Sequence, residues 1–130
     1  MSSADRSASA SADSPVIIDR IDHFVLTVAD IDATCEFYGR VLGMEKIVFA
    51  GGRVVLGFGG HKINLHPAGN EYDPRAKHPV PGSGDFCLIT ETPLAEVITH
   101  LGASGVEIIE GPVAKTGAQG AITSVYFRDP

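Results

Sequence analysis

Four polar side chains in this sequence are of the types that bind metal ions or small polar ligands: His23, Asn64, His66 and Asp85. Each lies in or beside a short run rich in β-branched and aromatic residues, which is typical of a strand. Successive side chains of a strand point to opposite faces of a sheet. If the apolar residues of each run face a helix-covered core, these four side chains share the opposite, concave face.

Two imidazoles and a carboxylate are suitable ligands for a divalent metal, so we predict a metal site formed by His23, His66 and Asp85. The set does not distinguish Zn, Ni, Mn, Fe and Co. A metal with an open position polarises a substrate oxygen or activates water. Taken singly, His66 before Pro67 and Asp85 after Gly84 are more typical of loop residues with local hydrogen bonds, and only the set on a shared face favours a site. No general base is identifiable.

The elements that must position these residues begin with a strand, a helix and three further strands. The predicted ranges are 21–28, 31–42, 45–49, 53–58 and 62–66. Gly43 ends the helix, because glycine readily adopts the left-handed conformation that follows a helix. Gly-Gly pairs separate the last three strands and predict turns between them.

The second half of the chain repeats this order at one constant offset, with Asp85 in the place of His23 and Gly105 in the place of Gly43. The predicted elements are a strand 85–90, a helix with an apolar stripe from 94 to 101, and strands 106–109 and 124–128. The glycine-containing segment 115–120 is predicted to be a flexible loop and is a candidate lid. We interpret the pattern as a duplication, although two unrelated segments with a common rhythm would look similar. No counterpart of the strand 62–66 follows.

Composition excludes several classes of protein. The chain has 130 residues and a formal net charge of −6, which argues against nucleic acid or an anionic membrane as the main partner. Its two cysteines cannot form a disulfide framework. No apolar run reaches the length of a membrane span. Residues 1–15 are rich in Ser and Ala and predict a disordered tail, so we expect one domain over 16–130 in a soluble, cytoplasmic protein.

Several motifs resemble those of the vicinal oxygen chelate superfamily, which includes glyoxalase I, fosfomycin-resistance proteins, extradiol dioxygenases and bleomycin-binding proteins. They lie at 22–28, 37–38, 41–44, 62–66, 78–83 and 126–130, and are closest to small glyoxalase-domain proteins. The resemblance implies an α+β fold in which paired β-α-β-β-β modules, about 21–68 and 84–130, form a partly open eight-stranded cup. The last strand would be missing from this chain.

The resemblance also implies where ligands lie in the cup. His23 matches the family's first-strand metal ligand and Asp85 its counterpart in the second module, where many relatives have His. Asn64 stands where glyoxalase I has Glu. The family's last Glu follows an Asp-Pro-Asp-Gly-Asn turn, and this sequence stops at 129–130 within that turn. We expect Asn64 and Tyr126 to contact the substrate.

The function expected from this resemblance is a metal-dependent, glyoxalase-like enzyme of the lyase, isomerase/epimerase or dioxygenase class. Its substrate would be a small molecule with vicinal oxygens, and the protein would be a homodimer, as relatives commonly are. The alternative is a non-catalytic small-molecule binding protein of the bleomycin-resistance type. A protein-interaction domain is a third possibility, favoured if no pocket forms.

Overall fold

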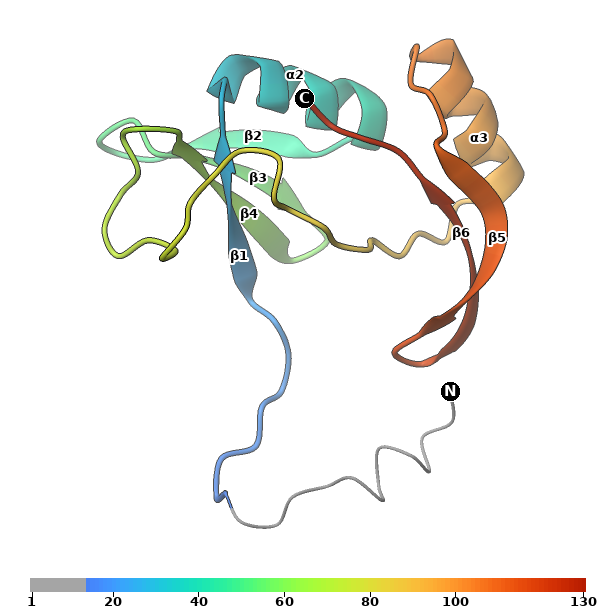
Figure 1. The fold of residues 1–130 in the computed structure, drawn as a ribbon, viewed down its shortest axis with the longest axis horizontal. Helices are drawn as coiled ribbons and strands as arrows, with labels where there is room; N and C mark the ends of the chain where they lie inside the picture. Colours follow the sequence, from blue (N-terminus) through green and yellow to red (C-terminus); the bar gives the residue numbers. More distant parts are fainter. Residues whose placement is uncertain (1–13) are drawn as a thin grey trace. The chain divides into compact units, whose positions relative to one another are not determined.

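The computed structural model describes residues 14–130, so the predicted tail lies almost entirely outside the described residues. The chain divides into two compact units (Figure 1). The first unit consists of Ile21–Glu91 together with Asp129–Pro130, and the second is built mainly of Thr92–Arg128. Along the described chain, no helix is long and apolar enough to cross a membrane.

The first unit contains the five elements expected from the first half of the sequence, in the expected order. They are β1 (His23–Val28), α2 (Ile31–Leu42), β2 (Glu45–Val48), β3 (Val54–Phe58) and β4 (His61–Pro67). The sheet has the order β1-β4-β3-β2. β1 runs parallel to β4, because α2 carries the chain back across the sheet, and the other neighbours are antiparallel.

Both ends of α2 are determined by local sequence. The Asp30 side chain accepts a hydrogen bond from the Ala33 backbone N–H at 2.9 Å, which satisfies one of the free donors of the first turn. Gly43 follows the helix with φ 69°, where a side chain would be strained. The helix buries one face, which includes Phe37 and Val41, against the sheet.

The core of the first unit lies on the helix-covered face of the sheet. Leu56, Ile63 and Leu65 are almost completely buried there, and the strand register brings them together with Leu26. Because side chains alternate along each strand, the residues between them point to the other face. This open face carries the residues of chemical interest.

The second unit consists of α3 (Leu94–Ala103) and a two-stranded antiparallel sheet of β5 (Glu110–Gly117) and β6 (Gly120–Tyr126). The helix agrees with the sequence prediction, and the predicted strand 124–128 overlaps the end of β6, but the rest of the prediction differs. The predicted strand 106–109 is wrong, because the chain first closes a turn in which the Val106 N–H donates to the Leu101 carbonyl at 2.9 Å. The predicted lid 115–120 is also wrong, since Lys115 pairs with Ile122 in the hairpin.

The predicted strand 85–90 has no place in a sheet of the described chain, although it contacts β1. The rings of Phe86 and Phe24 are 4.7 Å apart. An α+β fold is therefore confirmed, with six strands in two sheets over residues 14–130. The eight-stranded cup is not formed by these residues.

Candidate functional site

Asn64 lies at the centre of the open face of the first unit. The ladder places it between Val25 of β1 and Val55 of β3. Its Oδ1 is buried and has no hydrogen-bond partner among residues 14–130. A buried amide oxygen without a donor is costly unless water or a ligand satisfies it. A ligand-binding role for Asn64 stays a prediction.

The structure places His23 and His66 on the same face but not at the same point. His23 is opposite Lys62 in the ladder and His66 is opposite Thr27, so the two histidines are four residues apart along the strands. At about 3.3 Å per residue this is about 13 Å between their backbones. Within the described part of the chain, no three His, Cys, Asp or Glu side chains lie close enough together to hold a metal ion.

His23 has a carboxylate partner that orients its ring. Its Nδ1 lies 2.7 Å from the Asp22 carboxylate, and its side chain is 39% exposed. A carboxylate on one ring nitrogen fixes the tautomer and leaves the other nitrogen, Nε2, as an electron-pair donor. The pair is suited to binding a metal or accepting a proton through Nε2.

The two residues that flank Asp85 contact side chains of β1. Phe86 packs on Phe24, and a Cβ at Gly84 would lie 2.7 Å from the Leu26 side chain. These contacts bring the segment that carries Asp85 to the strand β1. Of the three predicted metal ligands, His23 lies on the edge strand β1 and His66 on the inner strand β4. The neighbours of Asp85 contact Phe24 and Leu26, whose side chains lie on the helix-covered face, whereas His23 points to the opposite face.

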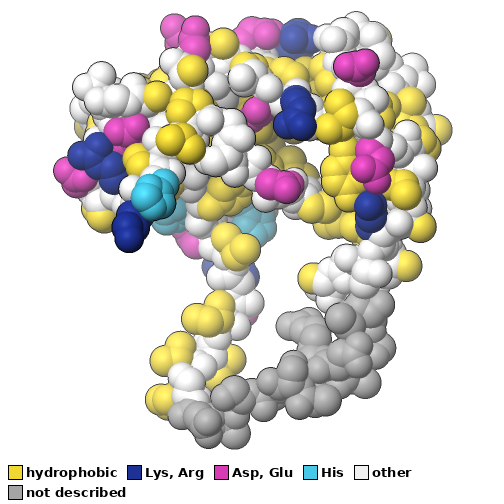
Figure 2. Space-filling view, in the orientation of Figure 1, with side chains coloured by type: hydrophobic (Ala, Val, Ile, Leu, Met, Phe, Trp, Pro, Cys, Tyr) yellow, Lys and Arg dark blue, Asp and Glu magenta, His cyan; other side chains and the backbone are white. Residues whose placement is uncertain are grey.

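A hollow of about 240 Å³ opens next to His66 on the same face. Its polar and aromatic lining comes from β3, β4, the turn between β2 and β3, and the loop after β4: Phe49, Arg53, Lys62, Asn64, His66 and Tyr72. In the space-filling view, Lys/Arg, Asp/Glu and His side chains gather at the left, on the side where Figure 1 shows the loop after β4 (Figure 2).

His66 forms part of the wall of the hollow and is only 7% exposed. Its ring meets the Tyr72 ring edge-on at 5.3 Å, and the Arg53 guanidinium lies 4.3 Å from the centre of the Tyr72 ring. Burial lowers the pKa of His66, and the nearby positive charge of Arg53 lowers it further. His66 is therefore neutral at physiological pH.

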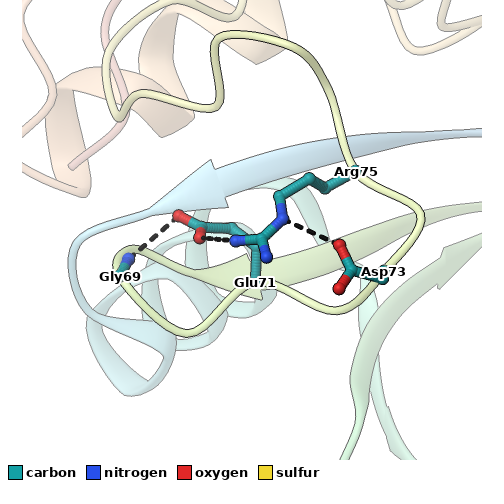
Figure 3. A network of polar contacts seen from close by, with 4 residues as sticks. All are labelled: Gly69, Glu71, Asp73 and Arg75. Atoms are coloured by element: carbon teal, nitrogen blue, oxygen red, sulfur yellow. Dashed lines mark hydrogen bonds and ion pairs between the residues drawn. The ribbon is translucent and has the colours of Figure 1, made fainter.

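The loop after β4 is held by a network of charged side chains (Figure 3). The Glu71 carboxylate accepts hydrogen bonds from the Gly69 backbone N–H and from Arg75, each at 2.9 Å. Arg75 also donates to Asp73 at 2.9 Å. The backbone hydrogen bond from Gly69 is the leading cause of a lowered Glu71 pKa. This network folds the loop so that Tyr72 covers His66.

Sequence reasoning missed Arg53, Tyr72 and the loop network. The available signal was the spacing of Glu71 and Arg75, because oppositely charged residues four positions apart often pair. Tyr126, predicted to bind substrate, lies in β6 of the second unit, with the Lys115 ammonium 5.5 Å from its ring centre.

This chain is similar to known proteins in both sequence and structure. A family described as "Glyoxalase/Bleomycin resistance protein/Dioxygenase superfamily" matches residues 20–130. Virulence protein STM3117 of Salmonella typhimurium is 51% identical over 115 residues, covering 88% of this chain and 80% of that protein. The crystal structure of STM3117 matches with a TM-score of 0.87, covering 88% of this chain and 91% of that chain.

Two further relatives are similar. Glyoxalase domain-containing protein RDO1 of Mycosarcoma maydis is 47% identical over 110 residues, and the match covers 85% of this chain and 62% of that protein. The structure of the integron cassette protein VCH_CASS1 from V. cholerae is 55% identical, with a TM-score of 0.86 and coverage of 88% of this chain and 90% of that chain.

Proposed function

This chain belongs to the glyoxalase/bleomycin resistance protein/dioxygenase superfamily, and from this membership we propose that it is a metal-dependent, glyoxalase-like enzyme. Its substrate would be a small molecule with two adjacent oxygens. The reaction would fall in the lyase, isomerase/epimerase or dioxygenase class. The observation that carries the proposal is the Asp22–His23 pair at the edge of the open face.

The residues near β1 fit a metal in part. His23 offers Nε2 while Asp22 holds Nδ1, and Asp85 would offer a carboxylate from a segment that contacts the same strand. His66 lies farther along the sheet in the wall of the hollow, so we propose His23 and Asp85 as the protein ligands within one copy. When bound, a divalent metal would polarise the substrate oxygens. Asn64 would orient the substrate through its unpaired Oδ1.

Elemental analysis of the purified protein tests this proposal. We expect stoichiometric metal in the wild type, its loss in His23→Ala and Asp85→Asn, and affinity weakened about 10- to 100-fold in Asp22→Asn. His78→Ala is the matched control, because His78 is an exposed loop histidine. Unchanged metal content in both His23→Ala and Asp85→Asn would exclude these ligands.

The second candidate is a non-catalytic small-molecule binding protein. The hollow favours it, because its wall is built from aromatic and cationic side chains that suit binding. This candidate predicts a wild type without stoichiometric metal, and a ligand affinity that His23→Ala leaves unchanged. Metal analysis and ligand binding on the same preparations therefore separate the two candidates.

We also propose that the protein is a homodimer. Several large apolar side chains of the first unit are exposed, among them Ile21, Val25 and Ile89. β1 is an edge strand of its sheet and is open to further pairing. Light scattering of the purified protein measures the mass directly, and a monomer at micromolar concentration would contradict the proposal.

A further inference from the structure

The hollow beside His66 carries positive charge that the protein does not neutralise. Arg53 and Lys62 line it, and neither forms an ion pair with a carboxylate among residues 14–130. Arg75 in the adjacent loop differs, because Glu71 and Asp73 both bind it. The hollow is therefore a site where an anion would gain charge pairing without displacing an existing partner.

Both cations are positioned by aromatic rings. The Arg53 guanidinium lies 4.3 Å from the centre of the Tyr72 ring, and the Lys62 ammonium lies 5.6 Å from the centre of the Phe49 ring. The Phe49 backbone N–H donates to the Arg53 carbonyl at 2.8 Å, so the Lys62 ammonium reaches the ring of a residue in the same turn that carries Arg53. A guanidinium that stacks through its face keeps the N–H groups of its edge for a planar carboxylate.

The deeper wall supplies a hydrogen-bond acceptor. The Asn64 Oδ1 is buried without a donor, which favours a ligand that carries a hydroxyl group. The aromatic rings of Phe49 and Tyr72 provide apolar contact for a short carbon chain. A volume of about 240 Å³ is below the usual range for drug-sized ligands, so the occupant is small.

We propose that this hollow binds a small hydroxycarboxylic acid, with its carboxylate at Arg53 and Lys62 and its hydroxyl donating to Asn64. This inference rests on the proposed function, because it takes the open face of the first unit as the side on which the substrate binds. It names the class of substrate, a small organic anion. The charge pairing itself needs neither metal nor catalysis.

The test is isothermal titration calorimetry of the full chain in the presence of a chelator, with malate, succinate and inorganic phosphate as probes. Succinate matches malate without the hydroxyl. We expect saturable malate binding that weakens with added salt, because charge pairing is screened. Failure of metal-dependent catalysis would leave this result standing, and a wild type that binds metal but no malate would overturn this proposal alone.

Three variants assign the contacts. Arg53→Met should weaken malate binding at least about tenfold, because it removes a charge-assisted hydrogen bond, and Lys62→Met should weaken it several-fold. Lys46→Met is the matched control. Lys46 lies opposite Leu56 in the strand ladder, so its side chain points to the helix-covered face, away from the hollow. Asn64→Leu should remove the preference for malate over succinate.

Three outcomes would overturn the proposal. One is equal malate affinity in Arg53→Met and in the wild type, with circular dichroism showing that both are folded. Another is a wild type that binds succinate as tightly as malate. The third is phosphate binding that is tighter than malate binding, which would identify an inorganic anion site instead.

Discussion

Replacing Tyr38 by Phe removes one oxygen atom from a contact that joins the helix α2 to the end of the chain. The Tyr38 hydroxyl donates to the Asp129 carboxylate at 2.6 Å, and Tyr38 is only 4% exposed. Phe keeps the ring and its packing. The variant therefore isolates a single hydrogen bond between residues far apart in the sequence.

The expected loss follows from the surroundings of the two groups. Hydrogen bonds to charged groups contribute about 1.5–3 kcal/mol. Asp129 is exposed, so water replaces the lost donor and the cost falls at the lower end of that range. We expect Tyr38→Phe to lower the free energy of unfolding by about 1.5 kcal/mol and the melting temperature by about 4 °C.

The same contact predicts a change at alkaline pH. Burial raises the pKa of Tyr38, and the hydrogen bond to Asp129 raises it further. Above about pH 10 the unfolded chain ionises this tyrosine while the folded chain keeps it protonated, so the folded state binds more protons and stability falls as pH rises. In Tyr38→Phe, the free energy of unfolding should therefore fall less as the pH rises above about 10.

Urea unfolding followed by circular dichroism, at neutral and alkaline pH, measures both effects. Tyr72→Phe is the matched control, because no hydrogen bond of the Tyr72 hydroxyl is present among the described residues, and its stability should change little. Asp129→Asn combined with Tyr38→Phe completes a double-mutant cycle. A loss below about 0.3 kcal/mol in Tyr38→Phe, or no coupling in the cycle, would refute the reasoning.

Three further changes test the fold. Leu56→Ala should cost about 3–5 kcal/mol in urea unfolding, because Leu56 is fully buried, whereas Val48→Ala at a half-exposed edge position should cost under about 1 kcal/mol; equal losses would contradict the assigned core. Gly111→Ala should destabilise the hairpin, since its Cβ would lie 2.3 Å from the Ser124 carbonyl oxygen at φ +99°, while Gly102→Ala in α3 meets no atom and should raise thermal stability slightly. Deleting residues 1–14 should leave the melting temperature unchanged, because the segment has no large apolar side chain after its first residue; a clear drop would disprove this.

The local elements of the first unit were predictable because their signals lie within a few residues of each other. Asp30 and Gly43 mark the ends of α2, and Gly-Gly turns separate the strands. Alternation also predicted correctly that His23, Asn64 and His66 face away from the core. The second unit was less predictable, because β propensity at 85–90 and 106–109 cannot reveal whether a partner strand is present.

Where His23 and His66 lie along their shared face of the sheet was decided only by the tertiary structure. Alternation has a period of two residues, so it determines to which face of the sheet a side chain points. A shift of two residues in the pairing of two strands leaves every side chain on the same face, so alternation cannot distinguish such pairings. Packing of Leu26, Ile63 and Leu65 under α2 selects the register that sets His23 opposite Lys62 and His66 opposite Thr27. The same packing separates the two histidines and leaves His66 beside the loop that brings Tyr72 and Arg53 together.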